Sequence, residues 1–149
     1  MPGAKNTAAI AATLEELTKA NVSIVNDRDW KLESKAAKAV LPHVASDYQA
    51  FWVNLSEKQG LSFSQAMAGI QSLVVESNPD YHEQILNIFS DVDDVAGSAK
   101  VEVHVLSTGY FETNVESIRE ARWRRDGHGV WWLYQHQSVR GISVDHVGL

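Results

Sequence analysis

Hydrophobic residues recur at helical spacing in the first third of the chain. Within residues 7–26, Ile10 and Leu14 lie four positions apart, so that they share one side of a predicted helix. A shorter helix is expected over residues 30–41, with the preceding aspartate as its cap. Pro42 ends it, because proline has no backbone N–H to donate. The chain therefore opens with two helices.

The next segment combines a strand with a third helix. Residues 43–53 are rich in residues that favour strands. After a polar loop, Ser62 and Gln65 have the spacing of a capping box, which predicts the start of a helix. Four apolar residues recur along one side of that helix: Phe63, Met67, Ile70 and Val74.

From Tyr81 onward the hydrophobic period changes from helical spacing to alternation. Asp126 and Gly127 separate the last two apolar segments and predict a tight hairpin turn with left-handed backbone angles. Helices followed by an antiparallel meander indicate an α+β fold, with the helices on one face of a curved sheet. The four expected strands cover residues 82–95, 98–114, 115–125 and 129–141.

Composition places the chain among small globular domains. Its 149 residues fit one domain, for which residues 1–6 and 142–149 are expected to be flexible tails. There is no cysteine, which excludes disulfides, thiolate catalysis and cysteine-based zinc sites. No segment approaches the roughly 18 apolar residues of a membrane span, and the N-terminus does not have the pattern of a secretion signal. We therefore expect a soluble, cytoplasmic protein.

The charge distribution argues against nucleic-acid binding. The formal net charge is −6, yet residues 119–140 hold five arginines against two acidic residues, a local balance of +3. This segment includes "RWRRDGHGVWW", whose basic and aromatic residues would suit a nucleic-acid-binding ribbon. An acidic body with one basic hairpin makes a poor general nucleic-acid binder, because phosphate neutralisation supplies most of the non-specific affinity.

Two interpretations are open for the strand at 98–114. Its valines form one apolar face, while the other face mixes polar and apolar groups such as His104 and Tyr110. Either the valines face the core and the mixed face meets water, or the mixed face lines a cavity, since ligand cavities combine apolar walls with a few polar groups. On the last hairpin, we expect one face to contribute Arg122, Trp132 and His136 to a pocket. The other face, with Trp123 and Trp131, is then a packing or dimer surface.

The sequence favours chemistry without a cofactor. None of its six histidines has the paired spacing of a helical zinc motif, and we expect no metal site. A glycine-rich phosphate loop, a nucleophile elbow and a dinucleotide fingerprint are all missing. His104 and His136 lie in mid-strand and are acid/base candidates, since an imidazole titrates near neutral pH. Glu120 and Arg122 would have to pair if they were buried, or would form a surface ion pair if they were not.

The order of elements, together with the stretch "NDRDWKLESKAAKAVLPHVASDYQAFW" and the "W…DG…GVW" hairpin, resembles the NTF2-like superfamily. Within it, the chain is most similar to the branch of SnoaL-like cyclases and scytalone dehydratase. The resemblance covers nearly the whole chain and implies a cone-shaped α+β barrel with an apolar pocket, dimerising through its convex sheet face. It also implies cofactor-free acid/base chemistry, although other members of the superfamily are non-catalytic.

Positions can be compared with scytalone dehydratase one by one. Tyr48 matches the tyrosine that holds the catalytic water, Tyr110 falls near a catalytic histidine, and Glu120 falls near a pocket asparagine. Ser23 stands where that enzyme has its catalytic aspartate, and its other active-site histidine has no counterpart beyond the nearby His82. Scytalone dehydration itself is therefore not expected.

Two hypotheses for the function follow. The first is a cofactor-independent isomerase, cyclase or dehydratase of secondary metabolism, acting on a small apolar polycyclic or polyketide-like substrate. The second is a non-catalytic ligand-binding or dimerisation domain, favoured by the missing aspartate at Ser23 and the aromatic final hairpin. For the enzyme, the catalytic candidates are Tyr48, His104, Tyr110, Glu120, Arg122 and His136, and the substrate-binding candidates are Trp52, Phe63, Met67, Phe89 and Trp132.

Overall fold

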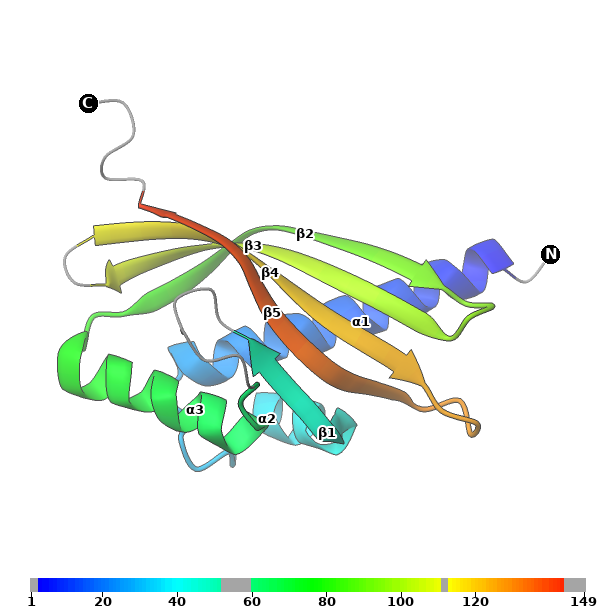
Figure 1. The fold of residues 1–149 in the computed structure, drawn as a ribbon, viewed down its shortest axis with the longest axis horizontal. Coiled ribbons are helices and arrows are strands. Elements are labelled where there is room, and N and C mark those ends of the chain that lie inside the picture. Colours follow the sequence, from blue (N-terminus) through cyan, green and yellow to red (C-terminus); the bar gives the residue numbers. More distant parts are fainter. Residues whose placement is uncertain (1–2, 52–59, 111–112, 144–149) are drawn as a thin grey trace.

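The computed structural model of the chain describes residues 3–51, 60–110 and 113–143. The predicted α+β class is confirmed in these residues: three α-helices lie on one side of a strongly twisted sheet of five strands (Figure 1). The helices are α1 (Gly3–Asn26), α2 (Lys35–Val40) and α3 (Phe63–Ser72), with a 3₁₀ turn at Leu41–His43 and a π-helical turn at Leu73–Ser77. The strands are β1 (Val44–Phe51), β2 (His82–Asp93), β3 (Ser98–Tyr110), β4 (Thr113–Arg125) and β5 (Trp131–Ser143).

The sheet is an antiparallel meander extended by one parallel strand. Its order is β1-β5-β4-β3-β2, in which β2 to β5 follow one another as antiparallel neighbours. β1 pairs in parallel with β5, so the strand expected before the third helix closes the far edge of the sheet. The pairing register shifts between Ile85 and Asn87 on β2, and between Leu133 and Gln135 on β5, where Tyr134 is the extra residue, as β-bulges do.

The valines of β3 face the helices. Val101 and Val105 are fully buried and Val103 is 3% exposed, whereas His104 between them is half-buried on the other face. Trp123 and Leu133, each 1% exposed, lie in the same core cluster as Leu14 of α1. The inner face of the sheet is therefore the apolar one. The expectation that Trp123 and Trp131 lie on the face opposite the pocket, as a packing or dimer surface, is wrong, because Trp123 belongs to this core and Trp131 packs against it.

The second helix is shorter than predicted. Arg28 and Leu32 both have a φ of 57°, a left-handed conformation that interrupts a helix. The Asp29 carboxylate accepts a hydrogen bond from the backbone N–H of Ser34 (3.0 Å), so it stabilises a loop instead of a helix start. Ser34 is the true N-cap, with its hydroxyl oxygen accepting from the N–H of Ala37 (3.1 Å).

The β4–β5 hairpin forms where it was predicted, with a different turn. Left-handed backbone angles occur at Gly129 (φ 82°), and the assignment of such angles to Asp126 and Gly127 is wrong. The Gly129 N–H donates to the Asp126 carbonyl (3.1 Å), and the Asp126 carboxylate accepts from the N–H of Val130 (3.0 Å) and from the indole N–H of Trp132 (2.9 Å). The loop is thus a turn closed by a left-handed glycine, one of the common longer hairpin connections.

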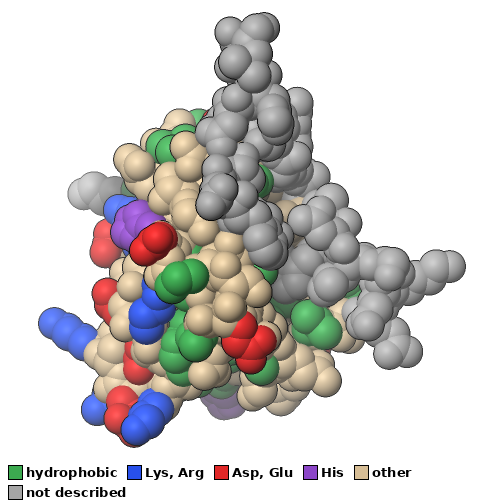
Figure 2. Space-filling model, turned by 90° about the vertical axis from the view of Figure 1, so that its left-hand side faces the viewer, with side chains coloured by type: hydrophobic (Ala, Val, Ile, Leu, Met, Phe, Trp, Pro, Cys, Tyr) green, Lys and Arg blue, Asp and Glu red, His purple; other side chains and the backbone are tan. Residues whose placement is uncertain are grey.

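Charged side chains on the surface are mixed in sign. On the end of the molecule drawn in Figure 2, acidic and basic side chains lie next to one another, with hydrophobic side chains in small areas between them. None of the helices in the described part of the chain has the length and apolarity that a membrane span requires.

Candidate functional site

Two adjoining cavities lie between the helices and the inner face of the sheet. Asn21 and Val22 of α1, Arg119 of β4 and His136 of β5 line both of them. Each cavity has a volume of about 40 Å³. Since one water needs roughly 10–15 Å³ by this measure, each has room for about three waters, far less than the roughly 300 Å³ or more of a pocket for a drug-sized ligand.

Helix α1 presents one continuous face to these cavities. Thr18, Asn21, Val22 and Val25 lie at the i, i+3, i+4 and i+7 positions of a helix, and all four line a cavity. Ser23, the position compared with a catalytic aspartate, lies off this face and donates its hydroxyl to the Lys19 carbonyl (3.2 Å). The α1 position from which a polar group reaches the interior is therefore Asn21.

A tyrosine and a histidine from the two parallel strands meet at the cavities. The Tyr48 hydroxyl lies 2.6 Å from Nδ1 of His136, and the two side chains are almost fully buried. The ring of Phe63 packs edge-on against Tyr48 at a centroid distance of 5.5 Å and limits its movement. This pair joins β1 to β5 through side chains as well as backbone hydrogen bonds.

Both members of this pair are neutral at pH 7. Burial raises the pKa of the Tyr48 hydroxyl above its usual range. Burial, with a smaller contribution from the positive charge of Arg119, lowers the pKa of His136 from 6.5 to about 4. A neutral imidazole bonded through Nδ1 has either a proton or a lone pair at Nε2, so the pair can exist in two tautomeric forms.

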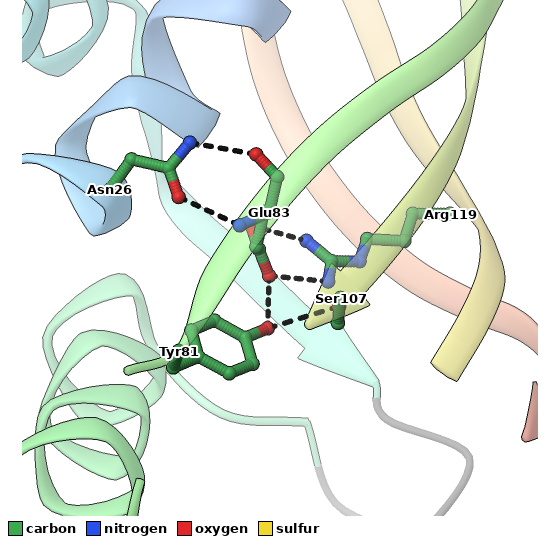
Figure 3. A network of polar contacts seen from close by, with 5 residues as sticks. All are labelled: Asn26, Tyr81, Glu83, Ser107 and Arg119. Atoms are coloured by element: carbon green, nitrogen blue, oxygen red, sulfur yellow. Dashed lines mark hydrogen bonds and ion pairs between the residues drawn. The ribbon is translucent and has the colours of Figure 1, made fainter. Parts of the chain in front are cut away.

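A buried ion pair between β2 and β4 forms part of the cavity walls. Arg119 donates from Nη1 to Oε1 of Glu83 (3.0 Å) and from Nη2 to Oε2 (2.5 Å), the bidentate geometry that matches guanidinium to carboxylate (Figure 3). The Tyr81 hydroxyl donates to Oε2 of Glu83 and lies 3.3 Å from the Ser107 hydroxyl. Asn26 holds the backbone of Glu83 from the end of α1, accepting from its N–H and donating to its carbonyl, both at 2.8 Å.

The charges of this network balance each other. Burial by itself would raise the pKa of Glu83, but the attraction of Arg119 and the hydrogen bonds to the carboxylate outweigh it and hold the pKa below its usual range. Burial and the Glu83 charge together raise the pKa of Tyr81, which keeps its proton. The result is an ionised pair inside the fold, with Arg119 lining both cavities.

The structure brings four of the sequence-predicted site residues together. Tyr48, Phe63, Met67 and His136 line the cavities. Two others cannot be placed: Trp52 lies outside the described residues, as does the side chain of Tyr110, which ends β3.

The remaining candidates lie away from the cavities, and their expected position in the pocket is wrong. His104 pairs with Glu116 on the outer face of the sheet. Glu120 and Arg122 form an ion pair there (3.3 Å), joined by Lys100 at 3.8 Å from Glu120. The last two, Phe89 and Trp132, also lie elsewhere: Phe89 is 60% exposed on the edge strand, and Trp132 bonds to the hairpin turn.

The bulge on β5 explains the wrong placement of Trp132. Strict alternation puts Trp132, Tyr134 and His136 on one face, but the register shift at Tyr134 turns Leu133 and His136 to the same, inner side. The prediction that His136 points into the pocket is therefore correct, but the residues grouped with it by strict alternation point to the outer face.

Sequence reasoning missed three of the polar residues that line the cavities: Asn21, Glu83 and Arg119. A signal for the arginine was present, because Arg119 has the same strand parity as Ala121 and Trp123, which form an apolar face. An arginine on an otherwise apolar strand face predicts a buried acidic partner, because an unpaired buried charge is strongly destabilising. Across the described ranges, no three His, Asp or Glu side chains are grouped so that they could bind a metal.

Comparisons with known proteins agree with this architecture. No family model matches the sequence, and no curated protein does. Among solved structures, an NTF2-like protein of unknown function from Pseudomonas putida KT2440 superimposes with a TM-score of 0.66 at 14% identity, covering 88% of this chain and 86% of the other. The chain has an NTF2-like fold. This confirms the fold expected from the sequence, whereas membership of the SnoaL-like branch stays a prediction.

Two further structures with the same architecture differ in what is known of them. A protein with a cystatin-like fold from Caulobacter vibrioides has a TM-score of 0.65 at 13% identity, with 90% of both chains covered. A hexachlorocyclohexane dehydrochlorinase, LinA Type2, has a TM-score of 0.63 at 11% identity, covering 96% of this chain and 94% of the other. The NTF2-like fold thus occurs in an enzyme and in proteins without an assigned activity.

Proposed function

We propose that the chain is a cofactor-independent acid–base enzyme that moves a proton at a carbon next to a carbonyl group. This step is common to the isomerases, cyclases and dehydratases expected from the sequence. The observation that carries the proposal is the neutral pair of Tyr48 and His136. The Tyr48 hydroxyl lies 2.6 Å from Nδ1 of His136, and both residues line the same cavity. Further support comes from the dehydrochlorinase with the same fold.

In the proposed reaction the pair exchanges one tautomer for the other. Nε2 of His136 takes the proton from the substrate carbon, and Nδ1 passes its own proton to the Tyr48 oxygen. The Tyr48 hydroxyl proton moves to the carbonyl oxygen, so the ketone becomes its enol. No net charge is created on the pair, which suits a buried site where an isolated charge would be costly. Reversal of these steps with the proton returned to another carbon gives an isomerisation.

Arg119 has a supporting role in this scheme. Its bidentate bond to Glu83 uses two of the five N–H donors of a guanidinium. Because it lines both cavities, a remaining N–H can donate to the oxygen on which negative charge develops. Glu83 keeps the guanidinium in place, and the paired charge explains how an arginine is retained among apolar walls.

The cavity volume narrows the substrate class. A polycyclic or polyketide-like molecule needs several hundred Å³, whereas the two cavities have about 40 Å³ each. The proposal therefore departs from the polycyclic substrate expected from the sequence and takes a small carbonyl compound in its place.

Deuterium exchange tests the proposal directly. We expect the protein to catalyse incorporation of deuterium from D₂O next to the carbonyl of at least one member of a panel of small ketones and aldehydes, followed by proton NMR. Exchange should be lost in His136→Gln and fall at least tenfold in Tyr48→Phe, since positioned acid–base groups contribute about 10²–10⁴-fold. Matched controls are His128→Gln, in the exposed turn, and Tyr134→Phe, on the outer face. Equal loss in the controls would refute the assignment.

The same small volume also favours a second candidate, the non-catalytic binding or dimerisation domain. In that case the interior would be a core with small voids, and the outer face of the sheet would pair with a second copy. The sequence-based proposal of a homodimer assigns the interface to this face. Analytical ultracentrifugation of the wild type and Tyr134→Arg tests it: a dimer that the substitution dissociates, with no exchange activity, would favour this function.

A further inference from the structure

Asn21 has a carboxamide without a hydrogen-bonding partner inside the fold. Its Oδ1 is buried and unpaired, one of three such side-chain atoms in the described residues. The other two belong to Arg122 and Trp123, neither of which lines either of the two cavities described above. Asn21 lines both cavities, beside Arg119 and His136.

The neighbouring polar groups are all paired, which makes Asn21 the exception. The Thr18 hydroxyl donates to the Leu14 carbonyl (2.8 Å), and Glu83 and His136 are bonded as described above. Asn26, five residues along the same helix, uses both atoms of its carboxamide on the backbone of Glu83. A buried polar group without a partner destabilises a fold and calls for an explanation, such as a ligand.

We infer that Asn21 is a substrate-recognition residue, which binds a hydroxyl group carried next to the reacting carbonyl. This inference rests on the proposed function, because Arg119 and His136 then hold the carbonyl and the carbon beside it. A hydroxyl suits the carboxamide in both of its orientations, since it can donate to Oδ1 or accept from Nδ2. The substrate class is therefore a small α-hydroxy ketone or α-hydroxy aldehyde.

Two asparagine substitutions on α1 test whether the carboxamide of Asn21 is unpaired in the fold. Asn21→Leu replaces an unpaired polar group by an apolar one of similar size, so its melting temperature should rise by about 2 °C or more. Asn26→Leu leaves the N–H and carbonyl of Glu83 without their partner, so its melting temperature should fall. If both substitutions lower the melting temperature alike, Asn21 is a structural residue and the inference is overturned.

Recognition is measured with two probes of equal size. Hydroxyacetone has a hydroxyl beside its carbonyl, and butanone has a methyl group in that place. The ratio of their catalysed exchange rates, each divided by the uncatalysed rate, should favour hydroxyacetone in the wild type and fall at least tenfold in Asn21→Leu. Ser23→Ala, off the cavity face, should keep the wild-type ratio. An unchanged ratio in Asn21→Leu would overturn the inference.

Measurements of probe binding distinguish a failure of the recognition by Asn21 from a failure of the proposed enzyme activity. If the wild type exchanges neither these probes nor any member of the ketone and aldehyde panel, the proposed enzyme activity fails, and recognition is judged from the dissociation constants of both probes by protein NMR. Tighter binding of hydroxyacetone that disappears in Asn21→Leu, with a shift of the Asn21 side-chain amide signal in the wild type, supports recognition without catalysis. Equal binding of the two probes by the wild type refutes it.

Discussion

The inner and outer faces of the sheet are built from the same strands, but their ion pairs differ in how far the charged partners are exposed to solvent. On β4, Arg119 points inward and is bound by Glu83, whose side chain is 4% exposed. One residue further along, Glu120 points outward and pairs with Arg122, whose side chain is 43% exposed. A one-residue step along a strand thus moves a charge from the inner to the outer face of the sheet, where its partner is solvated.

The difference shows that an ion pair has to be judged by its surroundings. In water, a paired charge gains little over a solvated one, so exposed pairs contribute about 0–1 kcal/mol. Inside a fold, the cost of removing each charge from water is large, and either partner left alone is strongly destabilising. The NTF2-like interior therefore holds its few polar groups in fixed arrangements, whereas the outer charges can be exchanged.

The largest predicted effect is on the inner ion pair. Arg119→Met leaves the Glu83 carboxylate buried without its cation and should lower the free energy of unfolding by about 3–5 kcal/mol, measured by urea denaturation. Its control is Arg124→Met, which removes a bidentate partner of the exposed Asp47 on the outer side and should change stability far less. The double variant Glu83→Leu/Arg119→Met should regain much of the loss. Equal effects of the two single substitutions would contradict the comparison.

Two leucines, one on β5 and one on β3, test the apolar side of the comparison. Leu133→Ala removes a side chain that is 1% exposed in the core and should cost about 2–5 kcal/mol of unfolding free energy. Leu106→Ala, on the half-buried outer face, should cost less. If the outer face binds a second copy, the effect of Leu106→Ala will grow with protein concentration, which thermal denaturation over a hundredfold concentration range detects.

Acid should destabilise the fold through His136 before it acts on Glu83. The folded-state pKa of His136 is about 4 against 6.5 when unfolded, so the unfolded chain binds the proton more readily. This stability is fully present above pH 6.5 and is lost as the pH falls toward 4, by about 3 kcal/mol in all. The pKa of Glu83 lies below its usual 4.5, so its contribution is lost only below that pH. His136→Gln should flatten the slope between pH 6.5 and 4, and His128→Gln should not.

Much of the fold could be predicted because its signals are local. The alternation in residues 98–114 and 115–125 reflects strands with one buried face, and the capping box of Ser62 and Gln65 forms as expected, with both reciprocal bonds. The second helix was placed too early, because the left-handed conformations of Arg28 and Leu32 depend on contacts that the local pattern does not contain. One such contact is the bond from the Arg28 guanidinium to the Pro79 carbonyl (3.2 Å), 51 residues away.

The candidate site was harder to predict because it depends on strand phase. A bulge inverts the alternation beyond it, and no residue type in the sequence predicts the bulge at Tyr134. Of the two interpretations of β3, the structure bears out the one in which the valines face the core, whereas His104 and Tyr110 are site candidates only for their chemistry on the mixed face. Tyr48 and His136 were identified, but their contact joins residues 88 positions apart and follows only from the parallel pairing of β1 with β5.

The smallest effect is expected for the charges of the outer face. Lys100 lies 3.4 Å from Glu102 and 3.8 Å from Glu120, with its own side chain 41% exposed. Lys100→Gln should therefore change the free energy of unfolding by no more than about 1 kcal/mol, and 1 M NaCl should remove most of that change by screening. The same salt should alter the effect of Arg119→Met much less, because buried charges are screened less than exposed ones. A larger, salt-resistant effect of Lys100→Gln would mean that this face is covered in solution.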